Sequence, residues 1–247
     1  MFKSVGHKGE ESRARIYDAA MALFRERGFE SATMRDVAAA AGMSLGAAYH
    51  YFPSKDSIIL AFYDRVTDEH ERRVRQALAG LTSLRDRLRA PFHIKLDILQ
   101  ADRPLMGALL RYAGQPDHPL SFLGAATRQI QVRSMVMFAE SLRGVSLPQE
   151  TRVLAPIALW AMHMGILLFF LYDKSPRQQL TRKLIDGGVD LFATALRLAK
   201  LPVLGGFRRK SLALLTEAGL VPRVHELATP NGALGAELRT PAAQEQP

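Results

Sequence analysis

The sequence contains no cysteine among its 247 residues. Disulfide bonds, thiolate metal sites and cysteine nucleophiles are therefore excluded together. The sequence also lacks a glycine-rich phosphate loop, a His-Glu-x-x-His zinc pattern and a Gly-x-Ser-x-Gly nucleophile turn. His93 and Asp97 lie one helical turn apart, but such pairs occur by chance in any helix. These absences predict that the protein is not an enzyme and holds neither a metal nor a cofactor.

The apolar core of a secretory signal is missing from residues 1–12, which are polar. Export is therefore not expected, and the absence of cysteine suits a reducing compartment. We predict a cytoplasmic protein. Because 48% of its residues are hydrophobic, the chain has enough apolar side chains to bury a core.

Excess positive charge is absent from the N-terminal part of the chain. The whole sequence has a net charge of +9, which on its own suggests a nucleic-acid partner. Residues 1–70, however, hold 9 Lys and Arg against 10 Asp and Glu. An argument for nucleic-acid binding must therefore rest on individually placed residues rather than on bulk charge.

Strand-like alternation of polar and apolar residues does not extend over any convincing length, so the sequence predicts an all-α fold. Ile16, Ala19, Leu23 and Phe24 recur at helical spacing, and Gly28 ends this first helix. Proline, glycine and aspartate mark the breaks farther along. Longer helices are expected at 55–79, 83–99, 104–113, 119–143, 149–172 and 176–200, followed by one or two amphipathic turns.

Two short helices follow the first one. Thr33 can cap the earlier of them, with Asp36 at the third position of a capping box, and Gly42 ends it. Ser44 caps the later helix, which runs through Tyr51. Two short helices joined by a glycine-containing turn form a helix-turn-helix unit, which places its second helix in the major groove of DNA.

The segment IYDAAMALFRERGFESATMRDVAAAAGMSLGAAYHYFPSKDSI resembles the N-terminal DNA-binding domain of the tetracycline-repressor (TetR) family. The resemblance is carried by Leu23-Phe24, Gly28-Phe29, Thr33, Val37-Ala38, Ala41-Gly42, Ser44, Gly46, Tyr49, Tyr51-Phe52 and Ser54-Lys55. It implies a three-helix DNA-binding domain at 10–56 and a larger helical domain for effector binding and dimerisation at 57–200. Residues 201–247 are expected to form a C-terminal extension, of which 229–247 has the composition of a flexible end.

The third helix of this family lies in the major groove of the operator, a channel about 12 Å wide. The stretch Leu45-Gly46-Ala47-Ala48 has the small side chains that such insertion requires. None of them can donate a hydrogen bond to a base. Direct readout is therefore expected from Arg35 and Ser44, or from Leu45 and Ala47 against thymine methyl groups, with DNA shape adding specificity.

The ring side chains that follow are predicted to contact phosphates rather than to stack on bases. The hydroxyls of Tyr49 and Tyr51 and the imidazole of His50 can donate to phosphate oxygens. Lys55 adds a charge at the start of the next helix. Thr33 caps a helix whose N-terminus is also expected to face the DNA backbone.

Residues 153–172 form an almost wholly apolar run that is long enough to cross a membrane. Pro156, Gly165 and the central His163 favour a protein core instead. In the family that the sequence resembles, the last two long helices of each subunit pair across a two-fold axis, and that role falls on 149–172 and 176–200. A homodimer also suits the symmetric reading of an operator. We therefore expect no membrane association.

The resemblance also implies that a small-molecule effector binds inside the larger domain and releases the DNA. The candidate lining residues are Phe92, His93, Met106, Tyr112, Trp160, His163, Met164 and Phe169. Methionine and aromatic residues at helical spacing belong to cores more often than to ligand sites. The abundance of apolar candidates nevertheless suggests a hydrophobic effector.

Together these inferences predict a homodimeric transcriptional regulator, acting as a repressor, that leaves its double-stranded DNA operator when a small effector binds. The helix at 55–79 joins the two domains and is expected to act as the lever between them. Two alternatives stay open. One is a membrane-anchored DNA-binding sensor that uses 153–172 as a span, and the other is a helical ligand carrier or enzyme whose helix-turn-helix does not function.

Overall fold

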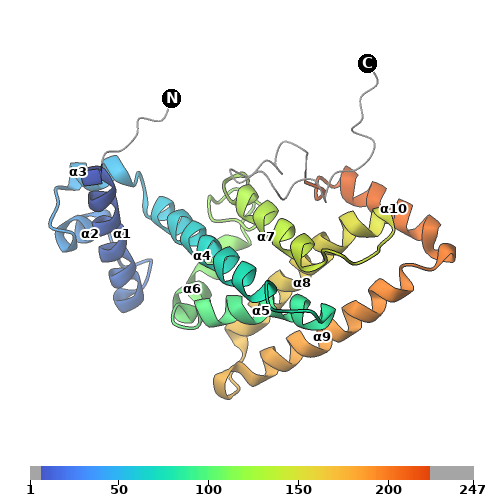
Figure 1. Cartoon of the computed structure of the whole chain (residues 1–247). Helices are drawn as coiled ribbons and strands as arrows, with labels where there is room; N and C mark the ends of the chain where they lie inside the picture. Colours follow the sequence, from blue (N-terminus) through green and yellow to red (C-terminus); the bar gives the residue numbers. More distant parts are fainter. Residues whose placement is uncertain (1–6, 223–247) are drawn as a thin grey trace. The chain divides into compact units, whose positions relative to one another are not determined.

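The computed structural model describes residues 7–222, and this part of the chain is built from helices without a strand (Figure 1). The predicted all-α fold is confirmed. The α-helices are α1 (His7–Arg27), α2 (Met34–Ala40), α3 (Leu45–Tyr51), α4 (Lys55–Leu78), α5 (Leu84–Leu99), α6 (Arg103–Ala113), α7 (Arg128–Ser141), α8 (Gln149–Tyr172), α9 (Gln179–Leu198) and α10 (Gly205–Glu217). Short 3-10 helices occur at Ala125–Thr127, Pro176–Gln178 and Pro202–Leu204.

The described residues fall into two compact units. The first unit comprises 7–65 and 100–128, and it holds α1, α2, α3, the start of α4, and α6. The second unit comprises 66–99 and 129–222, with the rest of α4 and the remaining helices. Helix α4 therefore belongs to both units. The first unit extends beyond the 10–56 expected for a DNA-binding domain, because it includes α6.

A small core holds α1, α2 and α3 together. Ala48 is 0% exposed, and Phe24 and Phe52 are each 1% exposed. Two turns between these helices use glycine where the backbone is left-handed, since φ is +84° at Gly28 and +64° at Gly42. Both glycines lie where the sequence predicts the end of a helix.

Helix α6 is held in the first unit by charged groups that lie far apart in the sequence. Arg25 on α1 donates two hydrogen bonds to the carboxylate of Asp102, at 2.6 and 3.2 Å. The ring of Phe29 meets the ring of Tyr112 edge-on, with centroids 5.7 Å apart. Tyr112 and its neighbour Met106 on α6 are therefore part of the first unit.

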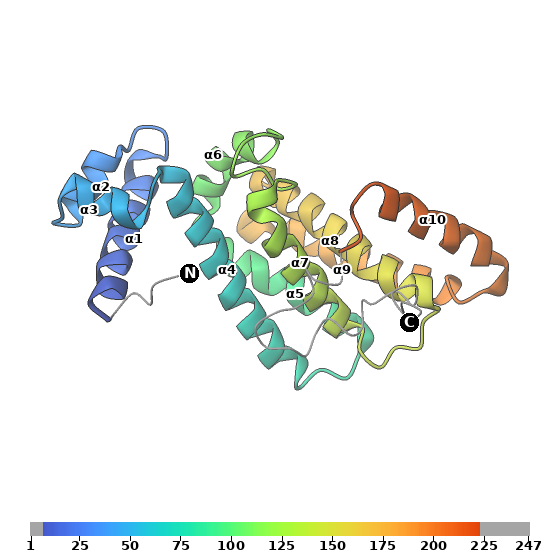
Figure 2. The ribbon, with the colours of Figure 1, turned by 90° about the horizontal axis from the view of Figure 1, so that it is seen from above.

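The second unit is a bundle in which α8 contacts α5, α9 and α10 (Figure 2). Phe92 on α5 and Phe138 on α7 are both 0% exposed, and their rings lie 5.1 Å apart. Helices α5 and α9 are joined by polar contacts, including one of 3.0 Å between Nε2 of His93 and Asp186. The bundle thus combines an aromatic core with polar links at its edge.

Helix α7 begins at Arg128, so the helix predicted at 119–143 is too long at its N-terminal end. Residues 114–124 form turns instead. The Ser121 amide donates to the His118 carbonyl, and the hydroxyl of Thr127 donates to the Ser121 carbonyl. The Gly124 amide also donates to the Ser121 carbonyl, at 3.1 Å, so this carbonyl is used within the turn and the helix starts only after it.

Two further boundaries differ from the sequence prediction. Helix α1 begins at His7, before the first residue of its apolar pattern. Helix α10 has 13 residues, more than the one or two turns expected after residue 200. The stretch 229–247, predicted to be flexible, lies outside the described residues.

Candidate nucleic-acid interface and effector region

The N-terminus of α2 has the capping box predicted from the sequence. The Asp36 amide donates to Oγ1 of Thr33 at 3.2 Å, and the Thr33 amide donates to the Asp36 carboxylate at 2.9 Å. The Thr33 hydroxyl donates to the same carboxylate at 2.6 Å, and these bonds hold the pKa of Asp36 below its ordinary value. The hydroxyl hydrogen of Thr33 is therefore used within the protein. Arg35, which is exposed beside it, is the longer donor on this turn.

The N-terminal half of α3 is exposed and has mostly small side chains. Oγ of Ser44 accepts a hydrogen bond from the Ala47 amide at 3.1 Å, which leaves the Ser44 hydroxyl hydrogen able to donate outward. Leu45 is 36% exposed, and a Cβ added to Gly46 would meet nothing within 4 Å. The fold therefore does not require glycine at this position, and the space around it is open to a partner.

The opposite side of α3 anchors the helix. Ala48 and Phe52 are buried, and the guanidinium of Arg13 lies 4.7 Å from the centre of the Phe52 ring. Ala47 is half-buried, so the open surface is narrower than the four small residues of the sequence suggested. Helix α3 thus has one packed side and one open side.

Three ring side chains occupy the C-terminal half of α3. Tyr49 is 48% exposed, His50 is exposed and Tyr51 is half-buried. The rings of His50 and Tyr51 meet edge-on, with centroids 5.1 Å apart. Because the imidazole is packed against Tyr51, it suits a hydrogen bond to a phosphate better than stacking between bases.

Lys55 begins α4, but its ammonium group points back into the first unit. Nζ donates to the carbonyl of Phe29 at 2.7 Å and to the carbonyl of Glu30 at 3.0 Å. It also lies 4.7 Å from the centre of the Phe29 ring. Lys55 therefore fixes the turn between α1 and α2 with two of its three ammonium hydrogens, and its contact with phosphate stays a prediction.

Arg15 holds α1 against the end of α2, a role that the sequence did not reveal. Its Nη2 donates to the Ala41 carbonyl at 2.7 Å. Because carbonyls at a helix C-terminus have partial negative charge, the guanidinium forms a charge-assisted bond there. In the sequence Arg15 looks like one of the solvated charges of α1, since its partner lies 26 residues away.

Four of the residues predicted to line an effector pocket lie in the interior of the second unit or at its margin. The rings of Phe92 and His163 lie 5.6 Å apart, and these residues are 0% and 2% exposed. Trp160 is 7% exposed and Met164 is half-buried, both on α8. We retain these four as candidates.

The other four predicted residues have different surroundings. His93 pairs with Asp186 at the edge of the bundle, and Phe169 is 40% exposed on α8. Met106 and Tyr112 belong to the first unit, where the Tyr112 ring stacks on His118 at 4.5 Å. The helical spacing of Met106 and Tyr112 in the sequence did not reveal that α6 packs with α1.

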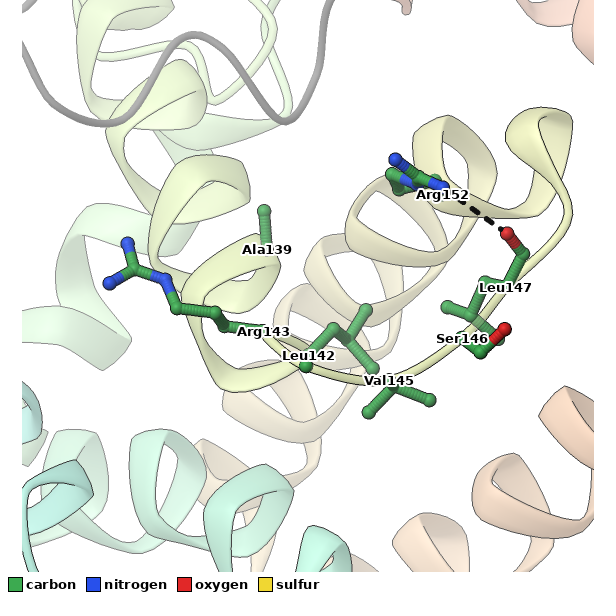
Figure 3. Close-up of a pocket in the computed structure, with 8 residues that line it drawn as sticks. Ala139, Leu142, Arg143, Val145, Ser146, Leu147 and Arg152 are labelled. Carbon is green, nitrogen blue, oxygen red and sulfur yellow. Dashed lines mark hydrogen bonds between the residues drawn. The ribbon is translucent and has the colours of Figure 1, made fainter.

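A surface pocket of about 340 Å³ lies where α7 ends and α8 begins (Figure 3). It is lined by Ala139, Leu142, Arg143, Gly144, Val145, Ser146, Leu147 and Arg152. Figure 3 shows the Arg152 side chain reaching the Leu147 carbonyl, at 3.4 Å. None of the predicted effector residues lines this pocket, so we do not assign the effector to it.

One side of α8 and α9 is apolar and exposed, and we call it the α8–α9 face. It consists of Ala158, Ala161, Gly165, Leu168 and Tyr172 on α8, and of Leu180, Leu184, Gly187, Leu191 and Leu198 on α9. Within each helix these residues are three, four or seven positions apart, which is the spacing of a helix-pairing seam. Tyr172 is 68% exposed and Leu191 is 75% exposed, so the seam has no partner within the described chain.

Helix α8 is the one helix among residues 7–222 that is long and apolar enough to cross a membrane. Half of the most apolar stretch of this helix is buried inside the structure. Val153, Ile157 and Ile166 are each 4% exposed or less. A core helix that also packs against a second copy has the same length and composition, so the apolar run does not require a membrane.

Two parts of the sequence match descriptions of known families. Residues 16–62, which hold the whole helix-turn-helix unit, match the bacterial regulatory proteins of the tetR family. Residues 87–207 match the tetracyclin repressor-like C-terminal domain. The chain belongs to the TetR family. This TetR-family protein is accordingly a DNA-binding transcriptional regulator and not an enzyme.

The curated relatives of this TetR-family regulator include a transcriptional activator and a transcriptional repressor. The transcriptional activator FasR of Mycolicibacterium smegmatis is 37% identical over 93 residues, which are 38% of this chain and 42% of FasR. The transcriptional repressor KstR2 of Rhodococcus jostii is 47% identical over 47 residues, which are 19% of this chain and 23% of KstR2. The chain thus spans less than half the length of each relative. An activator and a repressor together leave the direction of regulation to be tested.

Solved TetR-family structures share the fold over most of the chain. A TetR regulator from Nitrosomonas europaea has a TM-score of 0.56 at 22% identity, covering 73% of this chain and 97% of its own. Thermus thermophilus FadR, a repressor solved in complex with lauroyl-CoA, has a TM-score of 0.54 at 23% identity, covering 76% and 95%. At these identities the likeness shows the fold.

Proposed function

We propose that this protein is a homodimeric repressor that binds a double-stranded DNA operator through α3 and leaves it when a small hydrophobic molecule binds the second unit. The observation that supports the DNA contact best is the open N-terminal half of α3. Space around Gly46 is unoccupied, while Ala48 and Phe52 anchor the other side of the helix. A helix with such a side fits a major groove about 12 Å wide.

Base readout is assigned to a few side chains. Arg35 is exposed on α2 and can donate two hydrogen bonds to one guanine. The Ser44 hydroxyl can donate to a base acceptor while its oxygen continues to cap α3. Leu45 and Ala47 are placed to contact thymine methyl groups. With so few direct contacts, the shape of the operator supplies part of the specificity.

Phosphate contacts are assigned to the ring side chains of α3. Tyr49 and His50 are exposed donors, and the half-buried Tyr51 supports the imidazole and can offer its hydroxyl. The capped N-terminus of α2, at Thr33, presents backbone amides that favour a phosphate oxygen. These contacts position the protein on DNA but do not distinguish sequences.

The α8–α9 face is the proposed dimer interface. An exposed apolar surface of this extent marks an interaction site on a soluble protein. The small residues Ala158, Ala161 and Gly165 let a facing helix approach closely, while Leu184 and Leu191 supply side chains to interdigitate. A two-fold dimer would present two copies of α3 to the two halves of a palindromic operator.

Effector response is assigned to the second unit, where Phe92, Trp160, His163 and Met164 are retained as candidates. An effector changes DNA affinity only if it binds one arrangement of the protein better than the other. Helix α4 is the element through which this difference is proposed to travel, because it is continuous from Lys55 to Leu78 and belongs to both units.

Selection of bound sequences from a pool of random duplexes tests this function. The expected result is an inverted repeat bound by two protomers, with an affinity that falls as salt concentration rises. Failure of the folded, dimeric chain to enrich any consensus would overturn the proposal. Recovery of the expressed chain in the membrane fraction of cells, rather than as a soluble dimer, would favour the membrane-anchored alternative instead.

A further inference from the structure

Three basic side chains are buried together in the second unit, and we call them the buried basic cluster. Lys95 on α5 is 6% exposed, His70 on α4 is 1% exposed and His163 on α8 is 2% exposed. Lysine and histidine are seldom buried without a partner, because removing a polar or charged group from water costs free energy. A cluster of three such groups contributed by three helices therefore needs an explanation.

The surroundings of His163 are aromatic. Its ring centroid lies 5.6 Å from those of Phe92 and Phe138 and 5.9 Å from that of His70. Both ring nitrogens are buried, and neither has a hydrogen-bond partner among residues 7–222. A neutral imidazole presents one N–H donor and one acceptor, so His163 offers two unmet hydrogen bonds inside an apolar wall.

No carboxylate among residues 7–222 forms an ion pair with Lys95 alone. The acidic group that acts on it is Glu71, whose two oxygens already accept hydrogen bonds from Arg133 at 2.8 and 2.9 Å. Burial lowers the pKa of Lys95 to about 7, with Glu71 opposing that shift and Arg133 adding to it. The lysine is thus held close to neutrality and would gain from an additional negative charge beside it.

The two imidazoles stay neutral near pH 7. Burial, together with a smaller contribution from the charge of Lys95, lowers the pKa of His163 to about 3. Burial also lowers the pKa of His70 well below its ordinary value, and Lys95 and His163 contribute in the same direction. The cluster therefore combines one titratable ammonium with neutral imidazole donors. Groups with strongly shifted pKa values often gather at ligand-binding sites.

We propose that the buried basic cluster binds the anionic head of the effector, with the Lys95 ammonium and a His163 N–H as donors and the Phe92 and Phe138 rings against its apolar part. The ligand class is a small organic acid: one carboxylate on an apolar body. This inference rests on the proposed function, since it names the chemistry of the effector.

The position of His70 connects the cluster to α4. Nε2 of His70 donates to the Pro91 carbonyl at 2.7 Å, which ties α4 to α5 about one helical turn before Lys95. A bound carboxylate that attracts the Lys95 ammonium would shift α5, and with it the Pro91 carbonyl to which His70 is bonded. Ligand binding would then bias the helix that runs into the DNA-binding unit, which gives the effector a route to the operator contacts.

Two matched pairs of compounds test the ligand class on the full chain. The acids are decanoate and 4-butylbenzoate, and their neutral counterparts are decan-1-ol and 4-butylbenzyl alcohol. Isothermal titration at pH 7 is expected to show at least one acid binding about tenfold or more tightly than its alcohol, since a charged partner strengthens a buried hydrogen bond. Absence of acid binding, or equal binding of acid and alcohol, would overturn the proposal.

Lys95→Met removes the ammonium and keeps the length of the side chain. The preference for acid over alcohol is expected to disappear in this variant, while the affinity for the alcohol stays within a factor of about three. The matched control is Lys210→Met on α10, where the lysine is exposed, and it should keep the wild-type preference. A preference that survives Lys95→Met, with the variant melting cooperatively, contradicts the assignment.

A pH series on the wild-type chain keeps the test independent of any variant. Affinity for the acid is expected to be constant below pH 7 and to fall by up to about tenfold per unit above it, as Lys95 loses its proton in the free protein. The charged and titratable groups that face Lys95 are Glu71, Arg133, His70 and His163. The pKa values of both imidazoles lie below this range, and that of Arg133 lies above it. Affinity for the alcohol should not change, and a flat acid profile would exclude Lys95 as the anion's partner.

Parallel binding to the selected duplex separates this inference from the proposed function. A chain that binds its duplex but shows no preference for the acids retains its role as a DNA-binding regulator and loses only the anion site. A chain that binds an acid through Lys95 but enriches no duplex keeps the anion site and loses the proposed function.

Discussion

The first unit has its distinctive polar groups on the surface, whereas the second unit has them in its core. Ser44, which caps α3, and Tyr49 and His50 on α3 are all exposed. Gly46 lies between them in open space. Lys95 and His163 are no more than 6% exposed and lie among aromatic rings. A surface of donors suits a large, hydrated polyanion, while buried donors suit a small molecule that leaves water behind.

The difference also shows how each unit is stabilised. In the first unit polar groups satisfy one another, as in the capping box of Thr33 and Asp36 and in the bonds from Lys55 to two carbonyls. In the second unit, neither ring nitrogen of His163 has a hydrogen-bond partner within the part of the chain that the structure describes. An unmet buried polar group lowers stability, so its presence suggests that binding, rather than folding, has determined the residue.

The largest expected effect follows from breaking the α8–α9 face. Leu191→Glu places a charge at a site that is 75% exposed in one protomer but buried in the proposed dimer. We expect a monomer near 27.4 kDa in light scattering, and a loss of at least about a hundredfold in affinity for an inverted repeat, because one half-site contact is lost. Leu123→Glu, at an exposed leucine of the first unit, is the matched control and should remain dimeric.

Arg35→Ala should sharpen the distinction between base readout and phosphate contact. Loss of a bidentate contact is expected to cost about 1–3 kcal/mol at one base pair and to relax specificity there. Tyr49→Phe should instead weaken all sequences by a similar factor. Competition binding with single-base variants of the selected duplex measures both, and uniform weakening by Arg35→Ala would show that Arg35 contacts only phosphate.

The buried histidine makes the second unit sensitive to acid. Because the pKa of His163 is about 3 in the folded chain and about 6.5 when unfolded, the unfolded state binds more protons as pH falls below 6.5. Stability is then lost from pH 6.5 downward. His163→Leu is expected to reduce the loss between pH 7 and pH 5 by about 2 kcal/mol in urea unfolding. An unchanged pH dependence would mean that this imidazole is not held neutral.

Lys55→Met should affect folding rather than DNA electrostatics. Removing the bonds to the Phe29 and Glu30 carbonyls is expected to lower the free energy of unfolding of the chain by about 1–2 kcal/mol. The slope of log affinity against log salt should stay the same, because the two carbonyls hold the ammonium within the first unit. A slope smaller by about one unit would restore Lys55 to the phosphate contacts.

The sequence was most informative where structure depends on neighbouring residues. The caps at Thr33 and Ser44 and the stops at Gly28 and Gly42 follow from short-range chemistry, and the structure confirms them. Helix existence was likewise predictable from apolar spacing. The start of α7 was not, because it depends on a turn closed by the Thr127 side chain.

Contacts between distant residues account for the rest. Arg25 and Asp102 are 77 residues apart, and their bond places α6, with Met106 and Tyr112, in the first unit. Lys95 could not be singled out, because a lysine in an amphipathic helix normally faces water. Only packing of α4, α5 and α8 shows that it is buried.

Substitution of Gly46 tests the central claim, that the open half of α3 inserts into DNA. Gly46→Trp should leave the melting temperature unchanged or raise it, because a Cβ there meets nothing within 4 Å and glycine is unfavourable in a helix by up to about 1 kcal/mol. Gly107→Trp, on α6 of the same unit and equally unobstructed, is the matched control.

Titration of both variants against the selected duplex is the deciding measurement. We predict that Gly46→Trp loses at least about a hundredfold in affinity, while Gly107→Trp binds like the wild type. A folded Gly46→Trp protein with wild-type affinity for that duplex would contradict the assignment of α3 to the major groove.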